Sequence, residues 1–121
     1  MQKISDSEWL VMEVLWEKSP CVLKDIVDDL EDKTKWSRNT VHTYLTRMEK
    51  KKLVSIDKKH DPHLYSFYVS KEECLKQERD NLLNKVYQGA VGDMVADFLK
   101  DSKITPEEKE RLNKILDEME V

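Results

Sequence analysis

The hydrophobic period of this sequence changes twice, and that change limits the folds it can adopt. Residues 5–51 follow a helical period, residues 53–69 alternate in two short β-favouring segments, and the helical period returns from residue 70. Two glycines in 121 residues are too few for the many turns of a β-sandwich or barrel. The pattern predicts a mainly α fold with one small β-hairpin.

Three short motifs predict where helices begin. Ser5-x-x-Glu8, Ser70-x-x-Glu73 and Thr105-x-x-Glu108 are capping boxes, and Pro106 suits the first position of a helix. The segment after Ser5 is apolar at every position from Trp9 to Trp16 except Glu13, which predicts a helix buried on several sides.

Two further helices and a hairpin follow in the first part of the chain. Apolar residues from Val22 to Leu30 predict a second helix that is broken at 33–36, and Ser37 can cap a third helix that reaches about Lys51. Segments 53–59 and 63–69 would form strands on either side of a turn at 60–62. Three helices and a hairpin in this order predict a winged helix-turn-helix domain over residues 1–70.

Charge supports a nucleic-acid partner for this domain. The whole chain has a net charge of −4, but residues 33–59 hold nine basic residues against Glu49 and Asp57. A basic segment in an acidic chain is typical of a surface that faces phosphates, although a solvated helix face would have the same composition. Within it, the predicted third helix has an exposed polar face that suits base edges and phosphates: Asn39, Thr43, Thr46 and Lys50, flanked by His42 and Arg47. The neighbouring lysines Lys51, Lys52, Lys58 and Lys59 would also reach phosphates.

Residues 71–121 are expected to form a three-helix dimerisation domain. Gly89 and Gly92 would mark a break, followed by a helix around 93–100. About fifty residues cannot bury three apolar stripes alone, so self-association is expected, the alternative being that this tail folds back on its own winged domain. The residues expected at the dimer interface are Leu82, Leu83, Val86, Tyr87, Met94, Val95, Phe98, Leu99, Leu112, Ile115 and Leu116.

Four segments of the chain resemble the penicillinase and methicillin-resistance repressor family of the BlaI/MecI type. They are EWLVMEVLW (8–16), KWSRNTVHTYLTRMEKKKLV (35–54), YSFYVSKEE (65–73) and NKVYQGAVGDMVADFL (84–99). The family signature Trp-Ser-x-x-Thr begins at Trp36 and continues to Met48. These segments occur in the order and at the spacing found in the family, which makes the resemblance specific. Together they extend over nearly the whole chain.

The resemblance implies a homodimeric winged-helix repressor of double-stranded DNA operators with TACA/TGTA half-sites, controlling β-lactamase or other resistance genes. It places Arg38, Asn39, Thr40, His42, Thr43 and Arg47 at the DNA, with Lys58, Lys59 and His63 on the wing. Two positions depart from the family. His42 stands where arginine is frequent, and Lys52 replaces a glycine that is expected in a left-handed conformation. A lysine in that conformation destabilises the fold by about 1 kcal/mol relative to glycine.

The resemblance also implies a mode of release. In the family, a membrane sensor that binds β-lactams triggers proteolysis of the repressor at an Asn-Phe bond, and the matching pair is Asp97-Phe98. A copper-responsive branch has a C-x-C tail, whereas no cysteine follows Cys74, so we do not expect copper sensing by that route.

Other classes of function are less well supported. His60-x-x-His63 lacks the further ligands of a zinc site, and Cys21 at a helix start is more simply a packed cysteine than a redox switch. No catalytic triad or phosphate loop is present, so we expect no enzyme, metal or cofactor. No signal peptide or membrane span is expected, and the cysteines suit a cytoplasmic protein. Two alternatives stay open: a winged-helix regulator with a small ligand between its domains, and a protein-interaction module.

Overall fold

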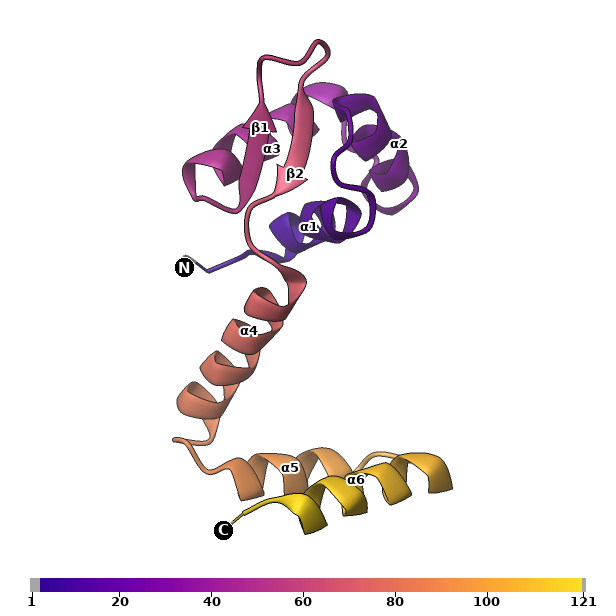
Figure 1. Cartoon of the computed structure of the whole chain (residues 1–121), viewed down its shortest axis with the longest axis vertical. Helices are drawn as coiled ribbons and strands as arrows, with labels where there is room; N and C mark the ends of the chain where they lie inside the picture. Colours follow the sequence, from indigo (N-terminus) through magenta and orange to yellow (C-terminus); the bar gives the residue numbers. More distant parts are fainter. Residues whose placement is uncertain (1–2, 121) are drawn as a thin grey trace. The chain divides into compact units, whose positions relative to one another are not determined.

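The computed structural model describes residues 3–120 and divides into two compact units, which are described separately. The first unit extends to Lys76 and the second begins at Gln77. The first unit therefore reaches six residues beyond the expected boundary at residue 70, because the buried Cys74 on the first turn of the next helix belongs to its core. The elements of the first unit are α1 (Asp6–Lys18), α2 (Leu23–Thr34), α3 (Arg38–Lys50), β1 (Val54–Asp57), β2 (Leu64–Phe67) and the start of α4 (Lys71–Val86) (Figure 1).

Helix α1 begins with a capping box and packs against three other elements of the first unit. The Ser5 hydroxyl accepts a hydrogen bond from the Glu8 amide at 3.1 Å, and the Ser5 amide donates to the Glu8 carboxylate at 2.9 Å. The predicted capping box is thus confirmed. The helix packs against α2, α3 and β2, which confirms that it is buried on several sides.

Helices α2 and α3 begin and end at positions set by local chemistry. Helix α2 ends at Thr34, within the expected break at 33–36, where Lys35 takes a left-handed φ of 58°. Ser37 caps α3, as predicted, by accepting a hydrogen bond from the Thr40 amide at 3.2 Å. Tyr44 of α3 stacks on Trp36, with ring centroids 4.7 Å apart.

The hairpin forms with shorter strands than expected. Strands β1 and β2 pair antiparallel, with Val54 opposite Phe67 and Ile56 opposite Tyr65. Tyr65 also exchanges two backbone hydrogen bonds with Cys21, of 2.8 and 3.0 Å. This bridge joins the hairpin to the segment between α1 and α2, so the wing has a fixed place on the three-helix body.

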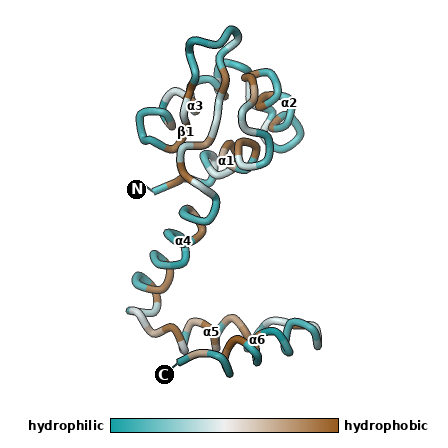
Figure 2. Tube along the Cα trace, in the orientation of Figure 1, coloured by the Kyte–Doolittle hydropathy of each residue, from teal (hydrophilic) through white to brown (hydrophobic). Residues whose placement is uncertain are grey.

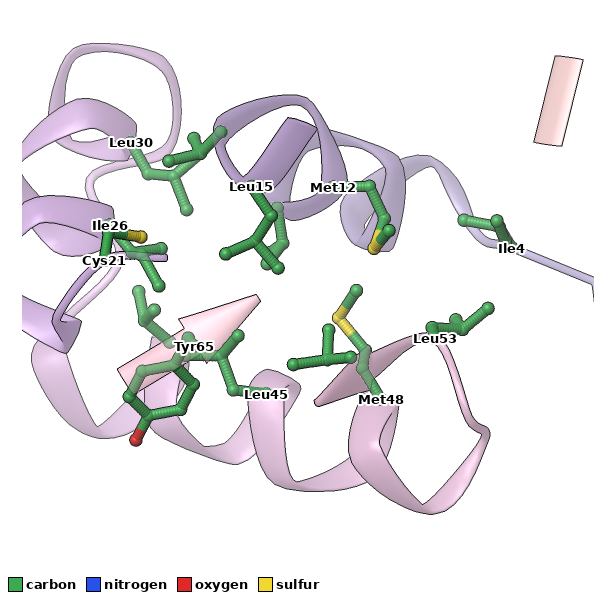
Figure 3. Packing of buried hydrophobic residues seen from close by; sticks show 14 of the residues in the cluster. Ile4, Met12, Leu15, Cys21, Ile26, Leu30, Leu45, Met48, Leu53 and Tyr65 are labelled. Atoms are coloured by element: carbon green, nitrogen blue, oxygen red, sulfur yellow. The ribbon is translucent and has the colours of Figure 1, made fainter. Parts of the chain in front are cut away.

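The core of the first unit is formed by all three helices and the hairpin. Met12 and Leu15 of α1, Leu45 and Met48 of α3, and Leu53 before β1 meet in one cluster (Figure 3). The Trp16 indole donates a hydrogen bond of 3.1 Å to the Val69 carbonyl, which fixes the chain as it leaves β2.

The second unit contains the rest of α4, α5 (Val91–Lys100) and α6 (Pro106–Glu118). The break before α5 lies at Gln88 and Gly89, both with positive φ. The expectation that Gly92 would also mark the break is wrong, because α5 begins at Val91 and contains Gly92. The Thr105–Glu108 capping box is formed, with hydrogen bonds of 3.1 and 3.2 Å.

Apolar side chains of the second unit face solvent in the single chain. Phe98 is 54% exposed and Leu116 is 59% exposed, and no hydrophobic residue of this unit is buried among the residues described. Brown, hydrophobic segments alternate with hydrophilic ones along α4, α5 and α6 (Figure 2). These helices are amphipathic and lack a core of their own in one copy.

Candidate nucleic-acid interface

Helix α3 presents one polar face to solvent and one apolar face to the core. Val41, Leu45 and Met48 are fully buried. The sequence-predicted residues of the other face are exposed at Arg38, Asn39, His42, Thr43, Arg47 and Lys50, and half-buried at Thr40 and Thr46. The helical period therefore brings all eight predicted residues of α3 to its solvent side.

The functional groups on this face are available to a ligand. Over residues 3–120, the side chains of Asn39, His42 and Arg47 form no hydrogen bond or ion pair. The Thr43 hydroxyl donates to the Asn39 carbonyl at 2.9 Å, and the Thr46 hydroxyl donates to the His42 carbonyl at 3.0 Å. Each threonine therefore keeps a hydroxyl acceptor and a methyl group, while asparagine and arginine can pair bidentately with adenine and guanine.

The wing lies beside α3 and is joined to it by an ion pair. Lys58 Nζ is 3.2 Å from the Glu49 carboxylate. The wing loop is held by its own contacts: the Lys59 amide donates to Asp57 at 3.0 Å, and His60 Nδ1 lies 2.7 Å from the Pro62 carbonyl. Lys58, Lys59 and His63 are all exposed, as a surface that contacts phosphates requires.

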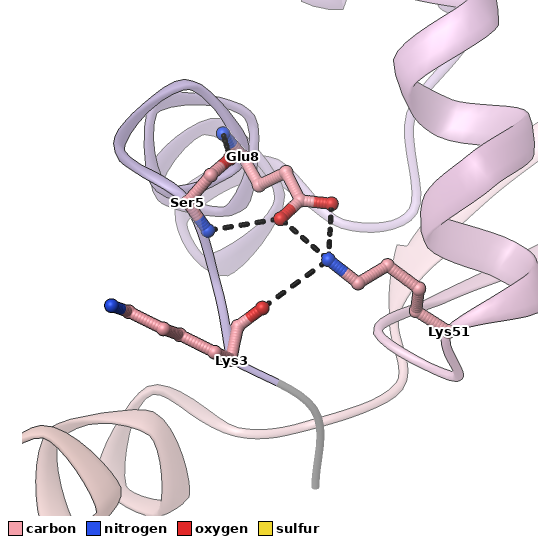
Figure 4. A network of polar contacts seen from close by, with 4 residues as sticks. All are labelled: Lys3, Ser5, Glu8 and Lys51. Carbon is pink, nitrogen blue, oxygen red and sulfur yellow. Dashed lines mark hydrogen bonds and ion pairs between the residues drawn. The ribbon is translucent and has the colours of Figure 1, made fainter. Parts of the chain in front are cut away.

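Lys51 does not belong to this basic surface, contrary to the expectation from sequence. Its ammonium lies 2.8 and 2.9 Å from the two oxygens of Glu8 and 3.2 Å from the Lys3 carbonyl (Figure 4). Glu8 is only 6% exposed; burial opposes its charge, but hydrogen bonds from Lys51 and Ser5, with the Lys51 charge, lower its pKa overall. Sequence reasoning missed this pair because 43 positions separate its members.

Lys52 adopts the left-handed conformation that the resemblance stated above implies for its position. Its φ is 61°, directly after α3, and its side chain is exposed. The turn is closed by hydrogen bonds from the Lys52 amide to the Glu49 carbonyl and from the Leu53 amide to the Met48 carbonyl. The turn therefore keeps a strained backbone where glycine would be relaxed.

The redox alternative for Cys21 is not supported. Its side chain is buried, and burial, followed by the charges of Asp25 and Asp29, raises the pKa of its thiol. Cys21 is thus a packed core residue, as the sequence favoured, and not a thiol whose pKa is lowered at a helix start. For metals, no group of three His, Cys, Asp or Glu side chains suited to an ion occurs in the described part of the chain.

The predicted dimer and cleavage residues lie on the helices of the second unit, except Tyr87, which directly follows α4. Asp97 and Phe98 are exposed on the C-terminal half of α5. Tyr87 at the end of α4 hydrogen-bonds to Asp97; limited desolvation, then this bond and the Asp97 charge, raise the pKa of Tyr87. The candidate scissile bond is therefore helical, and its Asp97 side chain is held by the tyrosine that follows α4.

The fold and this interface define a class of protein. A core of three helices, a hairpin wing tied to their connecting segment and a third helix with a free polar face are the features of a winged-helix DNA-binding domain. No helix over residues 3–120 is both long and apolar enough to cross a membrane.

Comparison with known proteins identifies the family within this class. The penicillinase repressor family model matches residues 4–118, so the chain belongs to the penicillinase repressor (BlaI/MecI) family of transcriptional repressors. It is 31% identical to the methicillin resistance regulatory protein MecI of Mammaliicoccus sciuri, over 94% of this chain and 93% of MecI. It is 29% identical to the penicillinase repressor of Bacillus licheniformis, over 96% and 91% of the two chains.

A solved structure of the same family shows similarity in fold. It is the solution structure of the monomeric form of Bacillus licheniformis BlaI in complex with the blaP half-operator. The TM-score is 0.52 at 28% identity, and the match covers 59% of this chain and 87% of the BlaI chain.

Proposed function

We propose that the chain is a homodimeric repressor that binds a palindromic operator with TACA and TGTA half-sites. The observation that carries this proposal is the unpartnered polar face of α3, which displays Asn39, Arg47 and neighbouring side chains beside a basic wing. Helix α3 would enter the major groove, and Lys50, Lys58 and Lys59 would meet the backbone. The BlaI complex with a half-operator supports one winged unit per half-site.

Two copies are proposed to associate through their second units. The exposed apolar residues of α4, α5 and α6 have no partner core in one chain, and a second copy can bury them. Two-fold symmetry of the protein would then match the symmetry of a palindrome. The acidic second unit would stay away from DNA, since residues 71–121 hold the whole net charge of −4.

Release is proposed to occur by proteolysis of the dimerisation unit between Asp97 and Phe98, in response to a membrane sensor. A cut there would separate Met94 and Val95 from Phe98 and Leu99, which share the apolar face of α5. The dimer would weaken, and with it the avidity for two half-sites. The names of the relatives support resistance genes, including that of a β-lactamase, as the targets.

Fluorescence anisotropy at physiological salt tests the DNA-binding part of this proposal. A TACA…TGTA palindrome should bind two chains per duplex, and a scrambled duplex of equal length should bind far more weakly. Arg47→Ala should weaken binding to the palindrome by about 1–3 kcal/mol, while Lys33→Ala, which removes one positive charge from the far end of α2, should have a small effect. Equal weak binding to both duplexes would contradict the proposal.

The cleavage site has a separate test. The N-terminal residue of the C-terminal fragment released in inducing cells should be Phe98. Sequencing of that fragment gives the answer directly, and a fragment that begins elsewhere would contradict this site.

A further inference from the structure

A groove in the first unit lies where the starts of two helices meet the wing loop. It has a volume of about 480 Å³ and is bordered by Leu23 and Lys24 of α2, Arg38 and His42 of α3, and Pro62 and His63 of the wing loop. This volume is within the range of sites for small organic ligands, about 300–1,000 Å³. The groove belongs to one unit, so its shape does not depend on how the two units are placed.

The side chain of Tyr65 lines the groove. Tyr65 is only 3% exposed, and its phenolic oxygen makes no hydrogen bond with the residues described. Because no buried side-chain oxygen lacks a partner in the described part of the chain, this oxygen is in contact with solvent. Its ring is packed near Leu45, while the oxygen points away from the core cluster (Figure 3). The hydroxyl can therefore exchange hydrogen bonds with water for hydrogen bonds with a ligand in the groove.

The charges around the groove favour an anion. Lys24 and Arg38 are cationic, His42 and His63 can donate hydrogen bonds, and Asp61 is the one carboxylate that borders the groove. Helix α2 also begins here at Val22 without a side-chain cap, so its first amide groups add positive potential. Lys24 makes only an exposed ion pair with Asp28, at 3.5 Å, and can turn toward a ligand.

The remaining border of the groove is apolar. Val22, Leu23 and Pro62 contribute hydrocarbon surface beside the Tyr65 ring. A bare inorganic ion would leave this surface in contact with water, whereas an organic anion would cover it. We propose that the groove binds a small organic carboxylate with a flat apolar body, whose carboxylate accepts hydrogen bonds from the Tyr65 hydroxyl and the neighbouring cations.

Such a ligand would compete with DNA. Arg38 and His42 border the groove and also belong to the face of α3 that is proposed to meet the operator. This consequence rests on the proposed function, but binding of the ligand does not. The carboxylate would therefore act as an inducer that needs no cleavage of the chain.

Binding is tested by NMR titration of the full chain with benzoate as the probe. Benzoate should shift the amide resonances of Val22, Lys24 and His63. Tyr65→Phe removes only the hydroxyl and should weaken binding roughly fivefold, the effect of one lost hydrogen bond. Tyr68→Phe is the matched control, because Tyr68 is 64% exposed and lies outside the groove.

Two further experiments distinguish binding of an organic carboxylate from binding of phosphate or of no ligand. Inorganic phosphate should shift the same resonances much less than benzoate. Binding of phosphate without binding of benzoate would overturn the proposal, because the groove would then be a contact site for DNA phosphates. Absence of shifts with either probe would also overturn it. In fluorescence anisotropy, benzoate should release the palindrome from the wild-type protein, and a fivefold higher concentration should be needed to release it from Tyr65→Phe. If the protein fails to bind DNA even without benzoate, the proposed function is rejected, but the NMR result on benzoate binding still stands.

Discussion

Lys51 Nζ lies 2.8 and 2.9 Å from the two carboxylate oxygens of Glu8, and so joins the residue after α3 to the first turn of α1. The same ammonium reaches the Lys3 carbonyl at 3.2 Å (Figure 4). The ion pair thus holds the end of the proposed recognition helix against the start of the chain. It is a structural contact within a basic segment whose other members face solvent.

Removal of this pair should destabilise the first unit. Lys51→Met leaves the Glu8 carboxylate buried without its main partner, and we expect a loss of about 2 kcal/mol in the free energy of unfolding. Urea titration followed by tryptophan fluorescence measures it, because Trp9, Trp16 and Trp36 all lie in the first unit. Lys18→Met, which breaks the exposed pair with Asp29, should have a much smaller effect on the free energy of unfolding. Equal losses in the two variants would contradict this account.

Acid should weaken the first unit through Glu8. Because folding lowers the pKa of Glu8 below its ordinary value of 4.5, the stability it contributes is fully present above that value. This contribution is lost as the pH falls through the lowered pKa. Glu8→Gln should flatten the stability profile below pH 4.5, measured by urea titrations at fixed protein concentration. Exposed Glu17→Gln is the control, and a profile unchanged by Glu8→Gln would refute the assignment.

Glycine at position 52 should stabilise the fold. Lys52 has a φ of 61°, which costs a side chain with a Cβ about 1 kcal/mol relative to glycine. Lys52→Gly should raise the free energy of unfolding by about 0.5–1 kcal/mol. This value includes the opposing effect of the greater conformational entropy of glycine in the unfolded chain. Lys52→Ala removes the same charge and keeps the Cβ, so it should bring no gain. Similar values for the two variants would show that the charge, not the backbone, is responsible.

Loss of the Glu49 carboxylate should strengthen DNA binding. Glu49 holds Lys58 of the wing at 3.2 Å and is the only acidic residue of α3. Glu49→Gln frees Lys58 and should tighten binding to palindromic and scrambled duplexes alike, with a steeper dependence on salt. Anisotropy at several salt concentrations measures both effects. Glu17→Gln, which removes a carboxylate from α1, should change neither, and a gain limited to the palindrome would argue for base recognition instead.

Local sequence signals predicted the elements well. The three capping boxes are formed, because each depends on a hydrogen bond between residues three positions apart. Gly92 was misjudged because glycine is tolerated in the first turn of a helix, and α5 starts before it. The end of α2 lies within the predicted break at 33–36, where a left-handed lysine at position 35 stops the helix without glycine.

The sequence by itself determined the order of elements, the winged-helix class and the polar face of α3. These follow from hydrophobic period and capping, which act over a few residues, and from motifs shared with a family. Only the tertiary structure decided that Lys51 pairs with Glu8, that Cys21 bridges to Tyr65, and that the Tyr65 hydroxyl opens into a groove. The first two relations join residues more than forty positions apart, and the groove collects residues from α2, α3 and the hairpin. Their distances are fixed by packing of the whole core rather than by any local pattern.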